Sequence, residues 1–338
     1  MNDWALLYKA STKKNWHGRI DSLTNPDSFR WHQSVKDLNL VNPKIHEIEH
    51  NKKNFCFLGF VCDEGVNRNL GRVGASKGSA YLRREMSNLA WDSDLNIGLF
   101  DAGNIVCKEK KLEEAQHALS EAIFKILCLD LIPVLLGGGH DIAFGHFIGI
   151  SNYLRSNKLT HKVGIINFDA HFDLRPVQTG IGSSGTMFSQ IAEYENNIGS
   201  DFNYYCVGIQ TYANTKSLFK RADELGVKFE LAKNINPSKI DELKDRIGKF
   251  IEDQKHIYLT ICADVFSSAH APGVSAPQPF GLHPEIALEL IKYVVASGKV
   301  ISFDLAEIAP RFDEDSRTAK LGAVLIYAII NTMAEIKT

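Results

Sequence analysis

The sequence lacks the features that mark several large classes of protein. Its 38 Lys and Arg against 40 Asp and Glu give a formal net charge of −2 over 338 residues. That balance leaves no basic excess of the kind that nucleic acids or anionic membranes require of a main partner. No uninterrupted apolar stretch approaches the roughly 18–20 residues that span a bilayer. We therefore expect neither a nucleic-acid nor a membrane partner.

Cysteine is sparse, and its six residues show no framework spacing. Several lie inside apolar runs, which is typical of a protein from a reducing compartment. The N-terminal segment 1–16 places an apolar patch before its lysines, the reverse of the order in a signal peptide. We therefore expect a cytoplasmic protein. The cysteines are Cys56, Cys62, Cys107, Cys128, Cys206 and Cys262.

Repeats, low-complexity tracts and linkers rich in Pro, Gly and Ser are also absent, so we expect a single domain over residues 1–338. Residues 1–50 are more polar and aromatic than the rest and are predicted to form an N-terminal wrap. What the chain does contain is a series of short apolar runs without polar alternation, which favours strands covered on both faces. These runs are Phe55–Val61, Asn96–Phe100, Ile132–Leu136, Val163–Phe168, Tyr204–Ile209, Val227–Leu231, Ile257–Ile261 and Val300–Leu305.

Longer amphipathic stretches lie between several of these runs. Residues 111–129 repeat apolar residues at three- and four-residue spacing, and Pro284–Ala296 opens with Pro and Glu as a helix does. A final helix, Ala319–Ile336, is apolar along most of its length and is expected to be packed. Strands that alternate with helices predict an α/β fold whose mainly parallel sheet lies between helices.

Polar clusters follow these strands, at the edge where open parallel sheets bind ligands. After Ile132–Leu136, three glycines allow tight turns with positive φ that present His140, although a Gly-rich turn ending in a packed His fits equally well. After the next strand, Asp169, His171 and Asp173 would share one face of an extended segment. Such a group is costly to bury unless it is hydrogen-bonded or a cation neutralises it, which favours a metal site over a solvated turn.

Two further clusters are weaker by themselves. Cys262 and Asp264 share a face after their strand, but a buried Cys is often inert filling. Asp304 and Glu307 could bind a cationic substrate, cap a helix or pair with Arg311. Taken together, these carboxylates and imidazoles suit Mn²⁺, and a binuclear centre would supply hydroxide near neutral pH. The nearby Glu307 suggests that the carbon under attack carries positively charged nitrogen.

The chain resembles the ureohydrolase superfamily, which includes arginases, agmatinases and formimidoylglutamases. The resemblance lies in the order and spacing of GGGHD (137–141), DAHFD (169–173), CAD (262–264) before APGVSAP, and SFDLAE (302–307). Other segments are similar to formimidoylglutamases in particular, and the resemblance extends from about residue 16 to the end of the chain. These segments are Trp16–Arg19, Arg30–Gln33, Gly59–Ala75, Asn167–Arg175 and Ser183–Thr186.

The resemblance implies a three-layer α/β/α fold with an eight-stranded, mainly parallel sheet and two Mn²⁺ ions per subunit at its C-terminal edge. The implied reaction is hydrolysis of N-formimidoyl-L-glutamate to L-glutamate and formamide in histidine degradation, by attack of a metal-bound hydroxide on the amidine carbon. One ion would be bound by His140 and Asp173. The other would be bound by His171 and Asp264, with Asp169 as the bridge.

The resemblance also implies roles toward the substrate. Asp173 would orient the hydroxide, and Glu307 would hold the amidinium group. Arg175 occupies a place where arginases carry a neutral residue, and its guanidinium could take a substrate carboxylate bidentately. Ser184 is a further candidate for a carboxylate contact. Residues 186–188 offer no counterpart of the proton-shuttling His of arginases.

One position departs from the family pattern: Cys262 stands where the second metal-bridging Asp is expected. A thiolate keeps the charge but offers one soft sulfur in place of two hard oxygens, which favours Zn²⁺ over Mn²⁺. A thiol can also be protonated or oxidised when the metal is absent. Three outcomes are open at this point: a working site with a Cys ligand, a site that holds less metal, or a loss of catalysis.

Two other functions compete with this interpretation. A guanidino-substrate ureohydrolase would release urea from arginine, agmatine or a guanidino acid, but Arg175 would repel a cationic amine tail. A metal-poor pseudoenzyme would keep the fold as a small-molecule sensor or as a subunit that regulates a partner. The preferred partner is the small-molecule substrate N-formimidoyl-L-glutamate, and the sequence leaves a homo-oligomer open.

Overall fold

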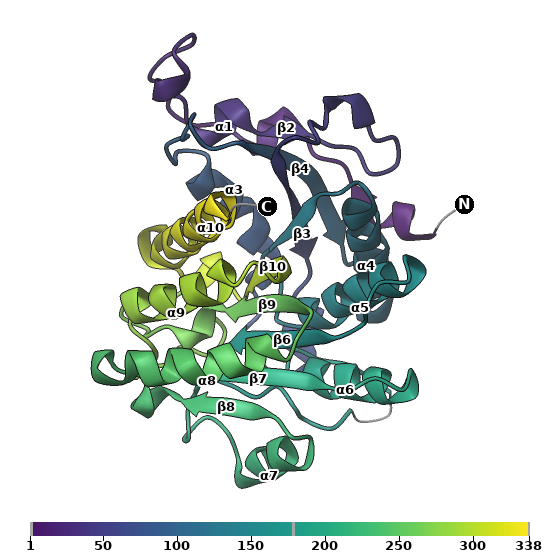
Figure 1. Ribbon diagram of the computed structural model, residues 1–338, viewed down its shortest axis with the longest axis vertical. Coiled ribbons are helices and arrows are strands. Elements are labelled where there is room, and N and C mark those ends of the chain that lie inside the picture. The colour runs from purple at the N-terminus through teal and green to yellow at the C-terminus, as the bar shows by residue number, and fades with distance from the viewer. Residues whose placement is uncertain (1–2, 178–179, 337–338) are drawn as a thin grey trace.

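A computed structural model describes residues 3–177 and 180–336, and its described strands form one sheet (Figure 1). The strands are β1 (Tyr8–Lys9), β2 (Lys36–Asp37), β3 (Lys53–Val61), β4 (Ile97–Val106), β5 (Ile132–Leu136), β6 (Val163–Phe168), β7 (Asn203–Ile209), β8 (Lys228–Leu231), β9 (His256–Cys262) and β10 (Val300–Ala306). Their spatial order is β1-β4-β3-β5-β10-β9-β6-β7-β8, with β2 also beside β4. The pairs among β3 to β10 are all parallel, whereas β1 runs antiparallel to β4.

The eight predicted apolar runs are confirmed as β3 to β10. The largest difference is at β4, which was expected to end at Phe100 but continues to Val106. The extension contains Asp101 and Asn104, whose side chains accept hydrogen bonds from Arg83 inside the protein. The strand therefore continues through these polar residues. The two-residue strands β1 and β2 extend the expected eight-stranded sheet, and they are too short to produce an apolar pattern.

Helices cover both faces of the sheet and give the expected three layers. In Figure 1, α3, α8, α9 and α10 lie on one side, and α4, α5 and α6 lie on the other. The predicted helices at 111–129, 284–296 and 319–336 are confirmed as α4, α9 and α10. The helices are α1 (Trp31–Ser34), α2 (Glu64–Arg68), α3 (Gly78–Met86), α4 (Leu112–Cys128), α5 (Ile142–Ser156), α6 (Met187–Asn197), α7 (Lys216–Glu224), α8 (Ile240–Glu252), α9 (Pro284–Ala296) and α10 (Arg317–Glu335).

Alternate residues of the central strands enter two separate hydrophobic cores. In β3, Phe55 and Phe57 belong to the core under α3 and α10, whereas Leu58 and Phe60 belong to the core under α4 and α5. All four are fully buried. Burial on both faces explains why these strands have continuous apolar runs, because neither set of alternating side chains meets water.

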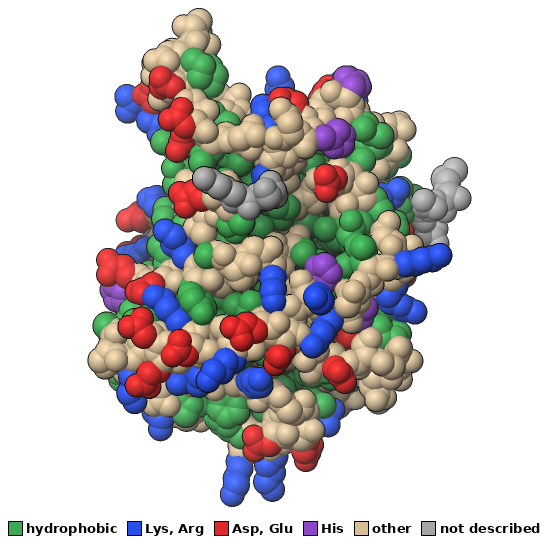
Figure 2. Space-filling model, in the orientation of Figure 1, with side chains coloured by type: hydrophobic (Ala, Val, Ile, Leu, Met, Phe, Trp, Pro, Cys, Tyr) green, Lys and Arg blue, Asp and Glu red, His purple; other side chains and the backbone are tan. Residues whose placement is uncertain are grey.

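The N-terminal residues pack against the edge of this sheet. The Trp16 and Trp31 rings lie 5.3 and 5.9 Å from the ring of Phe57, while Trp4 enters the other core. The N-terminal wrap and the single-domain organisation stay predictions. None of the helices in the described residues is long and apolar enough to cross a lipid bilayer. Figure 2 shows Lys and Arg interspersed with Asp and Glu over the visible face.

Candidate metal centre

The C-terminal ends of β5, β10, β9 and β6 meet at one edge of the sheet, because these neighbouring strands are parallel. A cavity of about 290 Å³ lies at this edge. Every predicted site residue except Asp169 lines it, and Asp169 is buried in contact with the lining residues. The lining residues are Asn69, Leu70, Gly71, Arg72, His140, His171, Asp173, Arg175, Ser184, Ala213, Cys262, Asp264, Ser275, Ala276 and Glu307.

The glycine turn after β5 presents His140 to the cavity. Gly137 and Gly138 have φ of 68° and 81°, so the expected positive φ is confirmed for these two. A Cβ at Gly138 would lie 2.8 Å from the carbonyl oxygen of Phe60, which excludes larger residues. The turn is also tied to Glu307, whose backbone N–H donates to Gly138 O at 2.9 Å and whose Oε1 accepts from the His140 N–H at 3.0 Å.

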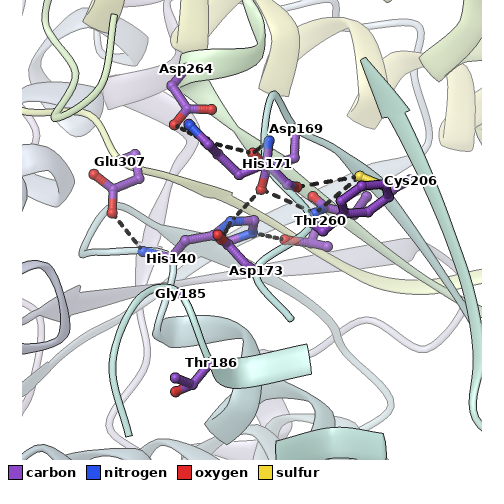
Figure 3. Close-up of polar contacts among 12 residues, drawn as sticks. His140, Asp169, His171, Asp173, Gly185, Thr186, Cys206, Thr260, Asp264 and Glu307 are labelled. Carbon is purple, nitrogen blue, oxygen red and sulfur yellow. Dashed lines mark hydrogen bonds and ion pairs between the residues drawn. The ribbon is translucent and has the colours of Figure 1, made fainter. Parts of the chain in front are cut away.

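Asp169 stands at the centre of two overlapping groups of donor atoms (Figure 3). Its Oδ2 lies 2.9 Å from His140 Nδ1, and its Oδ1 lies 3.5 Å from His171 Nδ1. Asp264 Oδ2 is 3.2 Å from His171 Nδ1 on the far side. The donor atoms of His140, Asp169 and Cys262 lie within 4.8 Å of one another, and so do those of Asp169, His171 and Asp264. Two cation sites that share one carboxylate fit this arrangement.

The predicted convergence of Asp169, His171 and Asp173 is present, but its cause is different from the one expected. The strand β6 ends at Phe168, and Asp173 has a φ of 50°, so residues 169–173 do not form an extended segment. The turn brings Asp173 Oδ2 to 3.4 Å from His140 Nδ1. Glu307 also has a left-handed φ, of 63°. Such backbone is strained for residues other than Gly and clusters at functional sites.

A buried network orients the imidazole of His140. Thr260 Oγ1 donates its hydrogen to Asp304 Oδ1 at 2.6 Å, and His140 Nε2 lies 2.9 Å from the same hydroxyl. Because that hydroxyl hydrogen is already used, His140 must donate from Nε2. The neutral imidazole then directs the lone pair of Nδ1 at the cavity, as a metal ligand requires.

Asp304 does not take any of the roles considered for it. It is fully buried within β10, where it accepts from Thr260 and Tyr258 and lies 2.6 Å from His146 Nδ1. The sequence analysis also missed Thr260 and His146. Nothing short of the strand pairing could have revealed them, since His146 and Asp304 are 158 positions apart.

Several buried atoms at the cavity remain without a hydrogen-bond partner among the described residues. They are His140 Nδ1, Asp264 Oδ1 and Glu307 Oε2. The neighbours of His140 Nδ1 are carboxylate oxygens of Asp169 and Asp173, which have no hydrogen to donate to its lone pair when the ring donates from Nε2. Burying unpartnered polar atoms is costly. Divalent cations between the carboxylates and imidazoles would satisfy the first two, so the residues present fit a metal pair. Glu307 Oε2 would remain available to a ligand in the cavity.

The electrostatics of the metal-free cavity reflect crowded negative charge. Burial, followed by the charge of Asp169, raises the pKa of Asp173 to about 6. Burial, followed by the charge of Asp264, raises the pKa of Glu307 to about 8. Burial alone would lower the pKa of His140, yet the carboxylates of Asp169 and Asp173 raise it well above its usual value. The group therefore attracts positive charge strongly.

Cys262 is fully enclosed and belongs to the His140 group, whereas Asp264 belongs to the His171 group. Burial, followed by the nearby carboxylates, raises the pKa of the Cys262 thiol well above its usual value. A cation close to the sulfur would have to displace this proton before the thiolate could bind it. Cys262, the residue that differs from the family pattern, thus lies next to one of the two candidate cation positions.

Arg175 and Ser184 both line the cavity, with Arg175 exposed and Ser184 buried. The Arg175 N–H donates to Gly185 O at 2.9 Å, and a Cβ at Gly185 would lie 2.7 Å from Arg175 Nη1. Glycine therefore leaves room for the side chains of Arg175, which is exposed, and Asn69. Ser184 is held by its N–H, which donates to Gly65 O at 3.1 Å. Asn69 was quoted within a motif but given no role in the sequence analysis.

Comparison with known proteins supports the resemblance. The model of the arginase family matches residues 53–331. The chain is 48% identical over 329 residues to a formimidoylglutamase of Clostridium tetani, with 97% of both chains covered, and 41% identical to one of Lysinibacillus sphaericus, with 97% and 98% covered.

Solved structures give the same picture. The fold matches that of formimidoylglutamase from Bacillus subtilis, with a TM-score of 0.78, 20% identity, and 95% and 97% of the two chains covered. It also matches Trypanosoma cruzi formiminoglutamase with Mn²⁺, with a TM-score of 0.74, 25% identity, and 89% and 100% covered. With its sheet order, its cavity and these relatives in agreement, this chain belongs to the arginase family.

Proposed function

We propose that the chain is a formimidoylglutamase, which hydrolyses N-formimidoyl-L-glutamate to L-glutamate and formamide with two Mn²⁺ ions per subunit. The near full-length relatives that carry this name support the proposal. The observation that carries the proposal is the set of side chains that line one cavity. Two overlapping donor groups lie there between a buried acid, Glu307, and an exposed guanidinium, Arg175. An amidine that bears carboxylates matches these two ends.

The metal ions would be held by the two groups around Asp169. His140, Asp173 and Cys262 would serve one ion, and His171 and Asp264 would serve the other, with Asp169 between them. When bound, such ions lower the pKa of water enough to make hydroxide available near neutral pH.

The residues around the cavity then guide the substrate. Glu307 Oε2, which has no other partner, accepts hydrogen bonds from the amidinium nitrogens, while Oε1 stays on the His140 backbone. Oxygen adds to the amidine carbon, and the bond from that carbon to the glutamate nitrogen breaks. Asp173 orients the nucleophile, takes up its proton and delivers that proton to the departing nitrogen. The products are the free amino group of glutamate and formamide.

The glutamate end of the substrate is bound at the cavity mouth. The planar guanidinium of Arg175 can pair with a carboxylate through two parallel hydrogen bonds, and Ser184 lies beside it. A cationic tail, such as that of arginine or agmatine, would instead be repelled. The arrangement therefore favours the amidino acid over the guanidino substrates of related enzymes.

The test measures formamide and urea released from N-formimidoyl-L-glutamate, arginine and agmatine by Mn²⁺-loaded protein. We expect formamide from the first substrate and no urea from the others. Arg175→Ala should lower kcat/KM by about 30-fold or more, because one partner of a charge pair is lost. Arg175→Lys keeps the positive charge but cannot make two parallel hydrogen bonds, so its kcat/KM should lie between those of the wild type and Arg175→Ala. Urea release that exceeds formamide release would overturn the substrate assignment.

Cys262 gives a separate test of the metal identity. Cys262→Asp should raise the Mn²⁺ affinity and the Mn²⁺-dependent rate, because hard carboxylate oxygens suit Mn²⁺ better than sulfur does. Zn²⁺ affinity should fall in the same variant. A metal content near zero in both the wild type and Cys262→Asp after Mn²⁺ incubation would identify a pseudoenzyme instead.

A further inference from the structure

A pair of thiols lies beyond the ends of β3 and β4, outside the metal centre. Val61 pairs with Val106 in the parallel register, and Cys62 and Cys107 are the next residues of the two strands. The Cys107 N–H donates to Val61 O at 3.1 Å, so the register continues to this point. Neighbouring strands lie about 4.8 Å apart, which is within the Cα separation that a disulfide bridges.

The two thiols also differ in character. Cys62 is buried and Cys107 is partly exposed, and both line a cavity of about 460 Å³ together with Asp63, Asn67 and Lys110. The neighbouring Cys62 thiol lowers the pKa of Cys107, and the Arg68 guanidinium lowers it further, against burial and the charges of Asp141 and Glu64. The Cys107 thiol and burial raise the pKa of Cys62. A partly exposed thiol of lowered pKa beside a second thiol is the arrangement of redox-sensitive pairs.

We propose that Cys62 and Cys107 are a modification site that reacts with low-molecular-weight disulfides and closes into an intramolecular disulfide coupled to the metal centre. The Cys107 thiolate attacks one sulfur of the reagent, forms a mixed disulfide and expels one thiolate. Cys62 then attacks the Cys107 sulfur, and its proton leaves with the second expelled thiolate as a thiol. The two protein thiols lose two electrons, and the reagent gains them as two thiols.

The coupling runs through the backbone of Cys62. Its carbonyl oxygen accepts from the Gly139 N–H at 3.0 Å, directly before His140. Three residues later, Gly65 O accepts from the Ser184 N–H. A bond that draws Cys62 toward Cys107 therefore acts on the segment that supports the His140 turn. Oxidation should weaken metal binding, whereas the thiol chemistry itself does not depend on the proposed function.

The test treats the folded full chain with bis(2-hydroxyethyl) disulfide and maps the products by mass spectrometry of its peptides. We expect loss of two thiols per chain and a linked pair of peptides that contain Cys62 and Cys107, reversed by dithiothreitol. Cys128 is the matched control, because it is exposed and burial raises its pKa. Cys107 should react about tenfold faster than Cys128, because more of it is thiolate.

Variants separate the steps. Cys62→Ser should stop at a mixed disulfide on Cys107, while Cys128→Ser should still form the link. Modification of Cys128 to completion without a Cys62–Cys107 link would overturn the site. Mn²⁺ titration before and after oxidation measures the coupling, with an expected loss of affinity of about threefold or more that Cys107→Ser abolishes. An unchanged Mn²⁺ affinity in linked protein would overturn the coupling even if the enzyme proves inactive.

Discussion

The molecule contains two buried polar clusters that differ in how completely their atoms are partnered. The first, here called the Arg83 cluster, joins α3 to β4. Arg83 donates to both oxygens of Asp101 at 2.8 Å, and also to Asn104 and to the Gly103 carbonyl. Trp16 Nε1 donates to Asp101 at 2.7 Å. Each carboxylate oxygen of this cluster is thus satisfied by the protein itself.

The second cluster is the candidate metal centre, where some buried polar atoms lack a protein partner within the part of the chain that the structure describes. His140 Nδ1, Asp264 Oδ1 and Glu307 Oε2 are equally buried but have no hydrogen-bond partner among the described residues. Both clusters contain carboxylates at 0% exposure, Asp101 in one and Asp169 in the other. Burial alone therefore does not distinguish a structural site from a functional one. Unused hydrogen-bonding capacity that is gathered around a cavity does, because a ligand can complete it there.

The largest expected effect comes from removing the carboxylate shared by the two donor groups. Asp169→Asn should lower formamide release by at least about 10³-fold, because both cation positions lose a ligand. Metal analysis of the purified variant should show loss of bound Mn²⁺, while circular dichroism stays native. Asp101→Asn is the matched control and should instead reduce the yield of folded protein. If Asp169→Asn kept the Mn²⁺ content of the wild type, the proposed difference between a metal-binding cluster and a structural cluster would be wrong.

The next effect concerns the fully partnered cluster. Arg83→Met should destabilise the fold by about 3–5 kcal/mol, because Asp101 is then left buried without its counter-charge. Urea denaturation gives this value, and the kcat of the protein that remains folded should match the wild type. Replacing both partners, Arg83→Met with Asp101→Leu, should recover part of the loss. A variant that keeps its stability but loses activity would contradict the structural role.

The smallest expected effect concerns Thr260, which contacts both the fully partnered Asp304 and the candidate metal ligand His140. Thr260→Val removes the hydroxyl that holds His140 Nε2 and should weaken Mn²⁺ binding about 10–100-fold. That change corresponds to about 1.4–2.7 kcal/mol of binding free energy. Thr260→Ser keeps the hydroxyl and should bind Mn²⁺ almost as well as the wild type. Equal losses in the two variants would show that packing, and not orientation of the imidazole, is responsible.

Much of the fold could be predicted because burial on both faces leaves a direct trace in the sequence. Apolar runs such as Val163–Phe168 mark the central strands, and polar residues that follow them, such as Asp169, mark the binding edge. The side that each polar residue faces was harder to predict. Asp304 lies within β10 and meets His146, whereas Glu307 lies just beyond β10 and lines the cavity. The two acids are only three positions apart, but one lies inside the strand and the other lies just after its end, so one is buried in the protein and the other faces the cavity.

The sequence by itself determined the parallel sheet, the edge at which His140, Asp169 and Cys262 gather, and the mixed character of the ligand set. The tertiary structure alone decided which buried acids would find hydrogen-bond partners within the protein. Asp101 meets Arg83 and Asp304 meets Thr260, while Glu307 keeps one free oxygen. The reason is that hydrogen-bond partners come from distant parts of the chain. Acids of similar chemistry therefore acquire different roles only when the strands and helices pack.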